Sequence, residues 1–194
     1  LKRFDIPVYT KQGTWRENQD KLIVPKNRLI ELTKGSLTLG SLIVEPFSVS
    51  HDAADPIGIN VFAGNNKATI VTDTGVISDN ILRRIDDTTL LVLEANYDPH
   101  MLRFGPYQPF LKQRVASDEG HLSNEMAAQA LLMMKRPDFM QVILAHRSEN
   151  NNNAVLVTQT IGKMLVDGGV RIGPEMKLQH GQPNEIVSIQ SVER

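Results

Sequence analysis

The stretch Thr89-Leu90-Leu91-Val92-Leu93-Glu94 decides the fold class of this chain. Four consecutive apolar residues are typical of a strand that is buried on both faces of a sheet. Such a strand needs neighbouring strands and covering helices, and it therefore predicts a sheet inside a mixed α/β protein.

The residues before this stretch predict a series of strands joined by turns. The turn signal Gly64-Asn65-Asn66 separates two of them. We expect strands over Asp5–Tyr9, Ser41–Val49, Ile57–Ala63 and Ala68–Thr72, a helical turn over Thr14–Lys21, and a hairpin of Arg28–Leu32 with Leu37–Leu39.

The residues after this stretch predict helices alternating with strands. We expect helices over Ser78–Arg84, Tyr107–Ala116, Ser123–Lys135 and Ala154–Val166, a buried strand over Gln141–Ala145, and a terminal hairpin of Arg171–Gln179 with Glu185–Ser191. The sequence therefore predicts a single α/β (α+β) domain over residues 1–194, with an antiparallel sheet covered by helices. A doubly wound nucleotide-binding fold is not indicated, because the chain has no GxGxxG or P-loop motif.

Composition excludes several classes of protein. The 194 residues carry 21 Lys+Arg against 22 Asp+Glu, a net charge of −1, so this is not a strongly basic nucleic-acid coat protein. The absence of cysteine excludes disulfide scaffolds, thiolate zinc sites and cysteine nucleophiles. No apolar run approaches the roughly 18 residues that span a membrane. With no signal peptide at the start, we expect a cytoplasmic protein.

Three of the predicted strands run into a residue that can bind a metal. His51 follows the strand Ser41–Val49, Asp73 follows Ala68–Thr72, and His146 follows Gln141–Ala145. Two imidazoles and a carboxylate suit Zn²⁺ or Mn²⁺, and a carboxylate can bridge two cations. Each residue has another interpretation, since a loop histidine can serve only as a hydrogen-bonding residue and an aspartate can form an Asx turn.

Other polar residues lie near the same predicted edge. Glu94 ends its strand and suits a partner of a histidine, although a solvated strand end is an equal alternative. His121 precedes a helix and can protonate a leaving oxygen, or simply cap the loop. The segment Arg147-Ser148-Glu149-Asn150-Asn151 precedes another helix and can hold phosphate in the same way. The cations Arg103, Lys112 and Arg114, interleaved with Tyr107 and Phe110, fit either a nucleic-acid groove or a solvated helix face.

Six ordered motifs resemble the metallo-β-lactamase-fold hydrolases of the YycJ (WalJ) type, over nearly the whole chain. They are Ser50-His51-Asp52-Ala53-Ala54-Asp55-Pro56, Thr72-Asp73-Thr74-Gly75, Leu93-Glu94-Ala95-Asn96, Gly105-Pro106-Tyr107, Gly120-His121-Leu122-Ser123-Asn124, and His146-Arg147-Ser148 through Asn151-Asn152. The resemblance implies an αβ/βα sandwich and a metal-dependent phosphodiester hydrolase, a DNA exonuclease acting with two divalent cations, Zn²⁺ or Mn²⁺.

The resemblance also implies a role for each residue. His51 and His146 would bind opposite metal ions with Asp73 bridging them. His121, paired with Glu94, would assist the leaving group. We expect Arg147, Ser148 and Asn151 to contact the substrate. Tyr97 departs from the pattern, because the subgroup usually has histidine there.

The family's first signature, His-x-His-x-Asp-His, should precede a segment like Phe4-Asp5-Ile6-Pro7-Val8-Tyr9. It is not among these residues, so we expect an N-terminally incomplete sandwich that alone is inactive and binds metal weakly or not at all. Sheet edges left open by the incomplete sandwich would favour pairing between copies. The alternative function is a non-catalytic module of the same fold that binds nucleic acid or protein, and a third keeps catalysis but changes the substrate.

Overall fold

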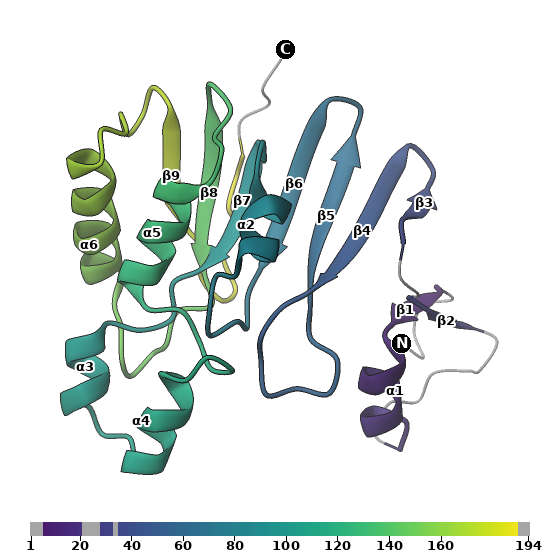
Figure 1. The fold of residues 1–194 in the computed structure, drawn as a ribbon, viewed down its shortest axis with the longest axis horizontal. Helices are drawn as coiled ribbons and strands as arrows, with labels where there is room; N and C mark the ends of the chain where they lie inside the picture. Colours follow the sequence, from purple (N-terminus) through teal and green to yellow (C-terminus); the bar gives the residue numbers. More distant parts are fainter. Residues whose placement is uncertain (1–5, 21–27, 33–34, 190–194) are drawn as a thin grey trace.

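A computed structural model describes residues 6–20, 28–32 and 35–189 of the chain, and it is built around one twisted seven-stranded sheet (Figure 1). The strands lie side by side in chain order: β3 (Leu37–Leu39), β4 (Leu42–Ser48), β5 (Ile57–Ala63), β6 (Asn66–Val71), β7 (Leu90–Glu94), β8 (Met140–Ala145) and β9 (Met176–His180). A separate parallel pair, β1 (Val8–Thr10) and β2 (Leu29–Glu31), accompanies helix α1 (Gln12–Asn18).

The sheet changes direction at β6. Strands β3 to β6 are antiparallel and joined by turns, whereas β6 to β9 are parallel. The expectation of an antiparallel sheet is therefore wrong for the second half. Each parallel strand follows a connection that contains helices, and such a crossover returns the chain to the same end of the sheet.

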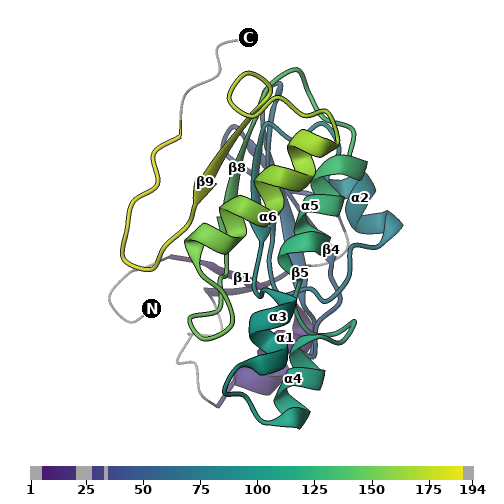
Figure 2. The same ribbon diagram turned by 90° about the vertical axis from the view of Figure 1, so that its left-hand side faces the viewer.

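Helices cover one face of this sheet (Figure 2). They are α2 (Asp79–Ile85), α5 (Asn124–Met133) and α6 (Ala154–Asp167), and their apolar residues form one buried cluster with β7 and β8. Two short helices, α3 (Pro99–Phe104) and α4 (Pro109–Val115), lie instead at the end of the sheet where β7 and β8 finish (Figure 1). This arrangement leaves the ends of the parallel strands between α4 and the loop after β8.

The opposite face of the sheet is open. Ile59, Ile70, Val92 and Ile143 are direct neighbours across four strands on this face. Ile70 is 42% exposed and the other three are half-buried, whereas Leu91 and Leu93 on the helix-covered face are fully buried. Leu90 and Val92, on the open face, are thus only half-buried, which corrects the expectation that the apolar run is buried on both faces.

Two predicted hairpins are wrong. Leu29–Glu31 pairs with β1, and β3 pairs with β4 through the turn Gly40-Ser41, where Gly40 has a φ of 61° that favours a tight hairpin. At the other end, β9 pairs in parallel with β8, because helix α6 provides a crossover. No strand is assigned over residues 181–189, and residues 190–191 of the predicted strand lie outside the described part.

Among the described residues, none of the helices combines the length and the apolar character that crossing a bilayer requires.

Candidate metal centre and active site

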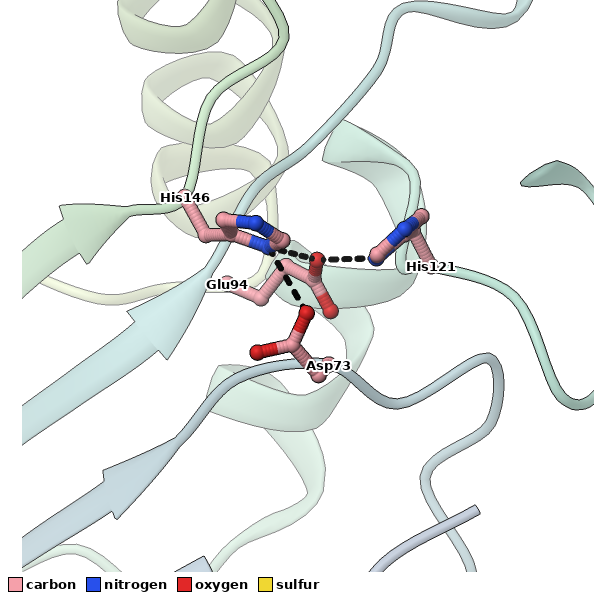
Figure 3. A group of neighbouring side chains, drawn as sticks. All are labelled: Asp73, Glu94, His121 and His146. Carbon is pink, nitrogen blue, oxygen red and sulfur yellow. Dashed lines mark hydrogen bonds and ion pairs between the residues drawn. The ribbon is translucent and has the colours of Figure 1, made fainter. Parts of the chain in front are cut away.

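Five chemistry-bearing residues from separate elements lie at one end of the sheet. Glu94 is the last residue of β7, and His146 comes directly after β8. Asp73 lies in the loop after β6, and His121 in the loop before α5 (Figure 3). His51 follows β4, and its ring centroid lies 5.1 Å from that of His121. The carboxyl ends of β6, β7 and β8 meet at this edge because these strands are parallel.

Glu94 is the centre of this group. Its side chain is completely buried, and its Oε1 lies 2.7 Å from Nδ1 of both His121 and His146 (Figure 3). The backbone N–H of Thr74 donates to the other oxygen, at 3.1 Å. Because a carboxylate only accepts hydrogen bonds, each imidazole donates through Nδ1 and directs Nε2 away from Glu94. One buried carboxylate therefore fixes the orientation of two histidines.

These contacts change the pKa values of Glu94 and His146. Burial raises the pKa of Glu94, but the hydrogen bonds from His121 and His146 outweigh burial, so the pKa lies below the ordinary value for glutamate. The hydrogen bond to Glu94 raises the pKa of His146 in turn. Glu94 is thus held as an anion that favours positive charge on the side chains in front of it.

Asp73 lies between two imidazoles. Its Oδ1 is 3.8 Å from Nε2 of His51 and 3.5 Å from Nδ1 of His146. Two ligands of one tetrahedral Zn²⁺ at about 2.1 Å from the ion lie about 3.4 Å apart. Across the described residues, single donor atoms of Asp73, Glu94, His121 and His146 all lie within 4.8 Å of one another. The donor chemistry and the Oδ1–Nε2 spacing of Asp73 and His51 fit a divalent cation, and His146, which donates Nδ1–H to Glu94, would bind one through Nε2.

Two of these residues have left-handed backbone conformations. Asp73 has a φ of 55° and His146 a φ of 51°. Residues other than glycine rarely adopt this region, although aspartate and histidine do so more often than most, and such residues cluster at functional sites. The backbone turns sharply at the end of β6 and of β8, which directs both side chains across the end of the sheet.

Buried asparagines hold the loop after β8 against the loop after β7. Asn152 donates to the carbonyls of Ala95 and Asn96 and exchanges hydrogen bonds with Asn124. Asn96 in turn donates to the carbonyl of His146, at 2.8 Å. Buried amides are expensive to leave unpaired, so this network fixes the loop that carries His146.

Gly120 brings His51 and His121 close together. Its carbonyl lies 3.1 Å from Nδ1 of His51, and His121 follows it directly in the chain. A Cβ added at this position would lie 2.3 Å from the carbonyl oxygens of Arg114 and Val115. Only glycine fits between the C-terminal end of α4 and the histidine cluster.

A hollow of about 350 Å³ opens in front of the histidines. His51, His121 and His146 form its polar side, Tyr107, Leu111 and Val115 its apolar side, and Arg114, Arg147 and Ser148 also line it. Arg114 donates from Nε to Asp52, and this hydrogen bond lowers the pKa of Asp52.

Of the three residues expected to contact the substrate, two line the hollow and one does not. Arg147 and Ser148 line the hollow, whereas Asn151 is fully buried behind it. The backbone N–H of Asn151 donates to Oγ of Ser148, at 3.1 Å. Asn151 therefore holds the loop in position, and its direct contact with a substrate stays a prediction.

The structure brings together every residue selected as a metal ligand or catalytic group from the sequence. Sequence reasoning paired Glu94 with His121 but missed its second contact with His146. It also missed Asp52, which lies 3.5 Å from Nε2 of His51, and the buried Asn124–Asn152 pair. The run of four asparagines at positions 150–153 was the available signal for the pair, because so many amides beside a helix start need partners.

Residues 1–146 match the β-lactamase superfamily domain. The chain belongs to the β-lactamase superfamily. This superfamily member is 34% identical over 194 residues to the exodeoxyribonuclease YycJ of Bacillus anthracis, a match that covers 98% of this chain and 73% of YycJ. It is 29% identical over 188 residues to the exodeoxyribonuclease WalJ of Streptococcus pneumoniae strain D39, covering 94% of this chain and 70% of WalJ.

Solved structures confirm the metallo-β-lactamase fold. The metallo-β-lactamase fold protein YhfI from Bacillus subtilis aligns with a TM-score of 0.63 at 13% identity, over 91% of this superfamily member and 62% of YhfI. Unliganded yeast PDE1 aligns with a TM-score of 0.61 at 12% identity, over 91% of this chain and 58% of PDE1. The chain therefore spans less than two thirds of either structural neighbour. The expected resemblance to the YycJ and WalJ proteins is confirmed.

Proposed function

We propose that this chain is the larger part of the catalytic domain of a metal-dependent exodeoxyribonuclease that cleaves DNA in the 5′-to-3′ direction. The observation that carries the proposal is the Asp73 carboxylate between the imidazoles of His51 and His146, with Glu94 buried behind them. The names of YycJ and WalJ support the reaction and the DNA substrate. A cytoplasmic location suits a chain without cysteine and gives access to DNA.

His51, Asp73 and His146 would hold two divalent cations, Zn²⁺ or Mn²⁺, with Asp73 between them. Bound cations would supply Lewis-acid activation of the phosphodiester and of the attacking water. Arg147 and Ser148 would hold the phosphate at the hollow. His121, oriented by Glu94, would donate a proton from Nε2 to the departing 3′ oxygen.

Three ligands do not complete a centre with two metal ions. We propose that further ligands come from a segment outside these 194 residues, as the resemblance implies, and that the 194 residues alone are inactive and bind metal weakly. The donor set supports this division, because the five histidines include no pair at i,i+2 or i,i+4 that would chelate a metal alone. Measurable DNA cleavage by the pure 194-residue chain in Mn²⁺ or Zn²⁺ would contradict it.

Asp73→Asn in the natural full-length protein tests the function. We expect the parent to shorten linear duplex DNA from its 5′ ends in the presence of Mn²⁺, and the variant to lose about 100-fold or more in rate, because an amide neither bridges cations nor balances their charge. Product ladders from end-labelled DNA measure both. Covalently closed circular DNA is the control and should stay intact.

If the parent binds DNA without shortening it under any divalent cation, the alternative of a non-catalytic binding module gains and the hydrolase proposal fails.

We also propose that copies of this 194-residue chain pair through the open face of the sheet, where Leu42 is 38% exposed and Ile70 is 42% exposed. Sedimentation should show association at micromolar concentration, and Ile70→Lys should weaken it. Val155→Lys is the matched control, because Val155 is exposed on α6, which covers the other face of the sheet. A single monomeric species of the parent would contradict the proposal.

A further inference from the structure

The hollow in front of the histidines has one apolar wall that the proposed chemistry does not use. Tyr107, Leu111 and Val115 form it, from α4 and the turn that precedes α4. Behind this wall Tyr97, Leu102 and Val115 form a small buried cluster of their own, against which Tyr107 and Leu111 pack. These packing contacts hold the apolar wall in place. Because the apolar wall and the histidines line the same hollow of about 350 Å³, a phosphate held at the histidines would place the rest of its molecule against Tyr107 and Leu111.

The rims of the hollow carry two guanidinium groups. Arg114 projects from α4, and its side chain is 60% exposed while its Nε is paired with Asp52. Arg147 lines this hollow and also a second one between the loop after β8 and Gly181, and its Nη1 is buried and makes no hydrogen bond within the described part of the chain. A buried guanidinium N–H without a partner costs free energy, and an anion such as a phosphate is the ligand that would satisfy it.

The hollow is also small. Nδ2 of Asn150, in the loop after β8, lies 3.5 Å from Oη of Tyr107, so this loop and the apolar wall are in contact. A volume of about 350 Å³ is at the lower end of the range for small-molecule sites, which suits one nucleotide and not a stretch of duplex. Purine and pyrimidine bases stack on aromatic side chains with little regard to sequence.

We propose that this hollow binds a single terminal deoxynucleotide, with its base against Tyr107 and Leu111 and its phosphate between Arg114, Arg147 and the histidines. This inference rests on the proposed nuclease function and adds to it the residues that select a strand end. Tyr107 and Leu111 are base-contacting residues, and Arg114 and Arg147 are phosphate-contacting residues.

Binding of two probes by the full-length protein in EDTA tests the base contact without relying on turnover. Thymidine 5′-monophosphate carries a base and deoxyribose 5-phosphate does not. By isothermal titration calorimetry we expect the parent to prefer the nucleotide, and Tyr107→Leu to weaken nucleotide binding about tenfold while leaving deoxyribose 5-phosphate unchanged. Tyr107→Phe keeps the ring and should bind like the parent. Arg114→Gln should weaken both probes.

Phe110→Ala is the matched control, because Phe110 is on the same helix, is 72% exposed and does not line the hollow. It should bind both probes as the parent does. Equal binding of the two probes by the parent, or unchanged nucleotide binding by Tyr107→Leu, would overturn the inference. The two proposals can fail separately. If the parent shortens DNA but Tyr107→Leu binds the nucleotide as the parent does, the nuclease function stands and the nucleotide site fails. If the parent binds the nucleotide but never shortens DNA, only the nucleotide site stands.

Discussion

Replacing Glu94 by glutamine should lower metal-dependent activity about 100-fold and lower the pKa of His146. Glutamine has nearly the same shape, but one of its two terminal atoms is a donor and it carries no charge. It cannot accept Nδ1–H from His121 and His146 while also accepting the N–H of Thr74 at its other atom. Loss of such an outer partner typically costs about 10- to 100-fold in metal affinity or activity. Because Glu94 touches two histidines, we expect the upper end of that range.

Two measurements check this. Metal affinity comes from competition with a chromogenic chelator, and the pKa of His146 comes from NMR titration in EDTA, where the variant should titrate at lower pH than the parent because the cause of its raised pKa is gone. Glu119→Gln is the control, since Glu119 is exposed in the loop that leads to His121. An unchanged metal affinity together with an unchanged His146 titration would show that Glu94 does not orient these rings.

Gly120→Ala should destabilise the fold and disturb the site together. The added Cβ would lie 2.3 Å from two carbonyl oxygens at the end of α4, and backbone atoms cannot move aside as a flexible side chain can. Forcing an extra methyl group into packed surroundings costs about 1–3 kcal/mol in the free energy of unfolding. The same shift moves the Gly120 carbonyl away from His51, so metal affinity should fall as well.

Gly162→Ala is the matched comparison and should have the opposite sign. Gly162 lies inside α6, and a Cβ there would meet only the side chain of Ile172, at 3.8 Å. Alanine is favoured over glycine inside a helix by about 0.5–1 kcal/mol, so this variant should be more stable than the parent. Urea denaturation of all three proteins gives the free energies of unfolding. If Gly120→Ala is as stable as the parent, the loop before His121 accommodates the added methyl group, and the predicted clash does not occur.

The sequence predicted the strands and their ends better than it predicted how they pair. Apolar runs such as Leu90–Leu93 identify a strand without its partners, because the same run fits a parallel or an antiparallel neighbour. The direction of β8 depends on the path that residues 95–139 take between β7 and β8. Helix α3 in this connection was not expected from the sequence. The pairing of β2 with β1 depends on contacts between distant residues, which no local turn signal encodes.

The candidate site was predictable where its residues terminate strands. His51, Asp73, Glu94 and His146 could be selected because metal-binding side chains followed apolar runs. For Tyr107 and Arg114 the sequence left two interpretations open, a nucleic-acid groove or a solvated helix face, since a seven-residue helix such as α4 has too few turns for its pattern to decide which face meets the protein. Only the tertiary structure shows that Arg114 and Tyr107 line the hollow while Phe110 points to solvent.

The change of direction at β6 has a consequence for how the molecule folds. Strands β4, β5 and β6 are neighbours in the chain and can pair across the loop 49–56 and the turn Gly64-Asn65. The pairing of β7 with β8 requires a far longer loop to close, with three helices inside it, and this costs more entropy before any contact compensates. We therefore expect His146 to join His51 and Asp73 late in folding, so that capture of a metal ion by all three would report that the slow half of the sheet has formed.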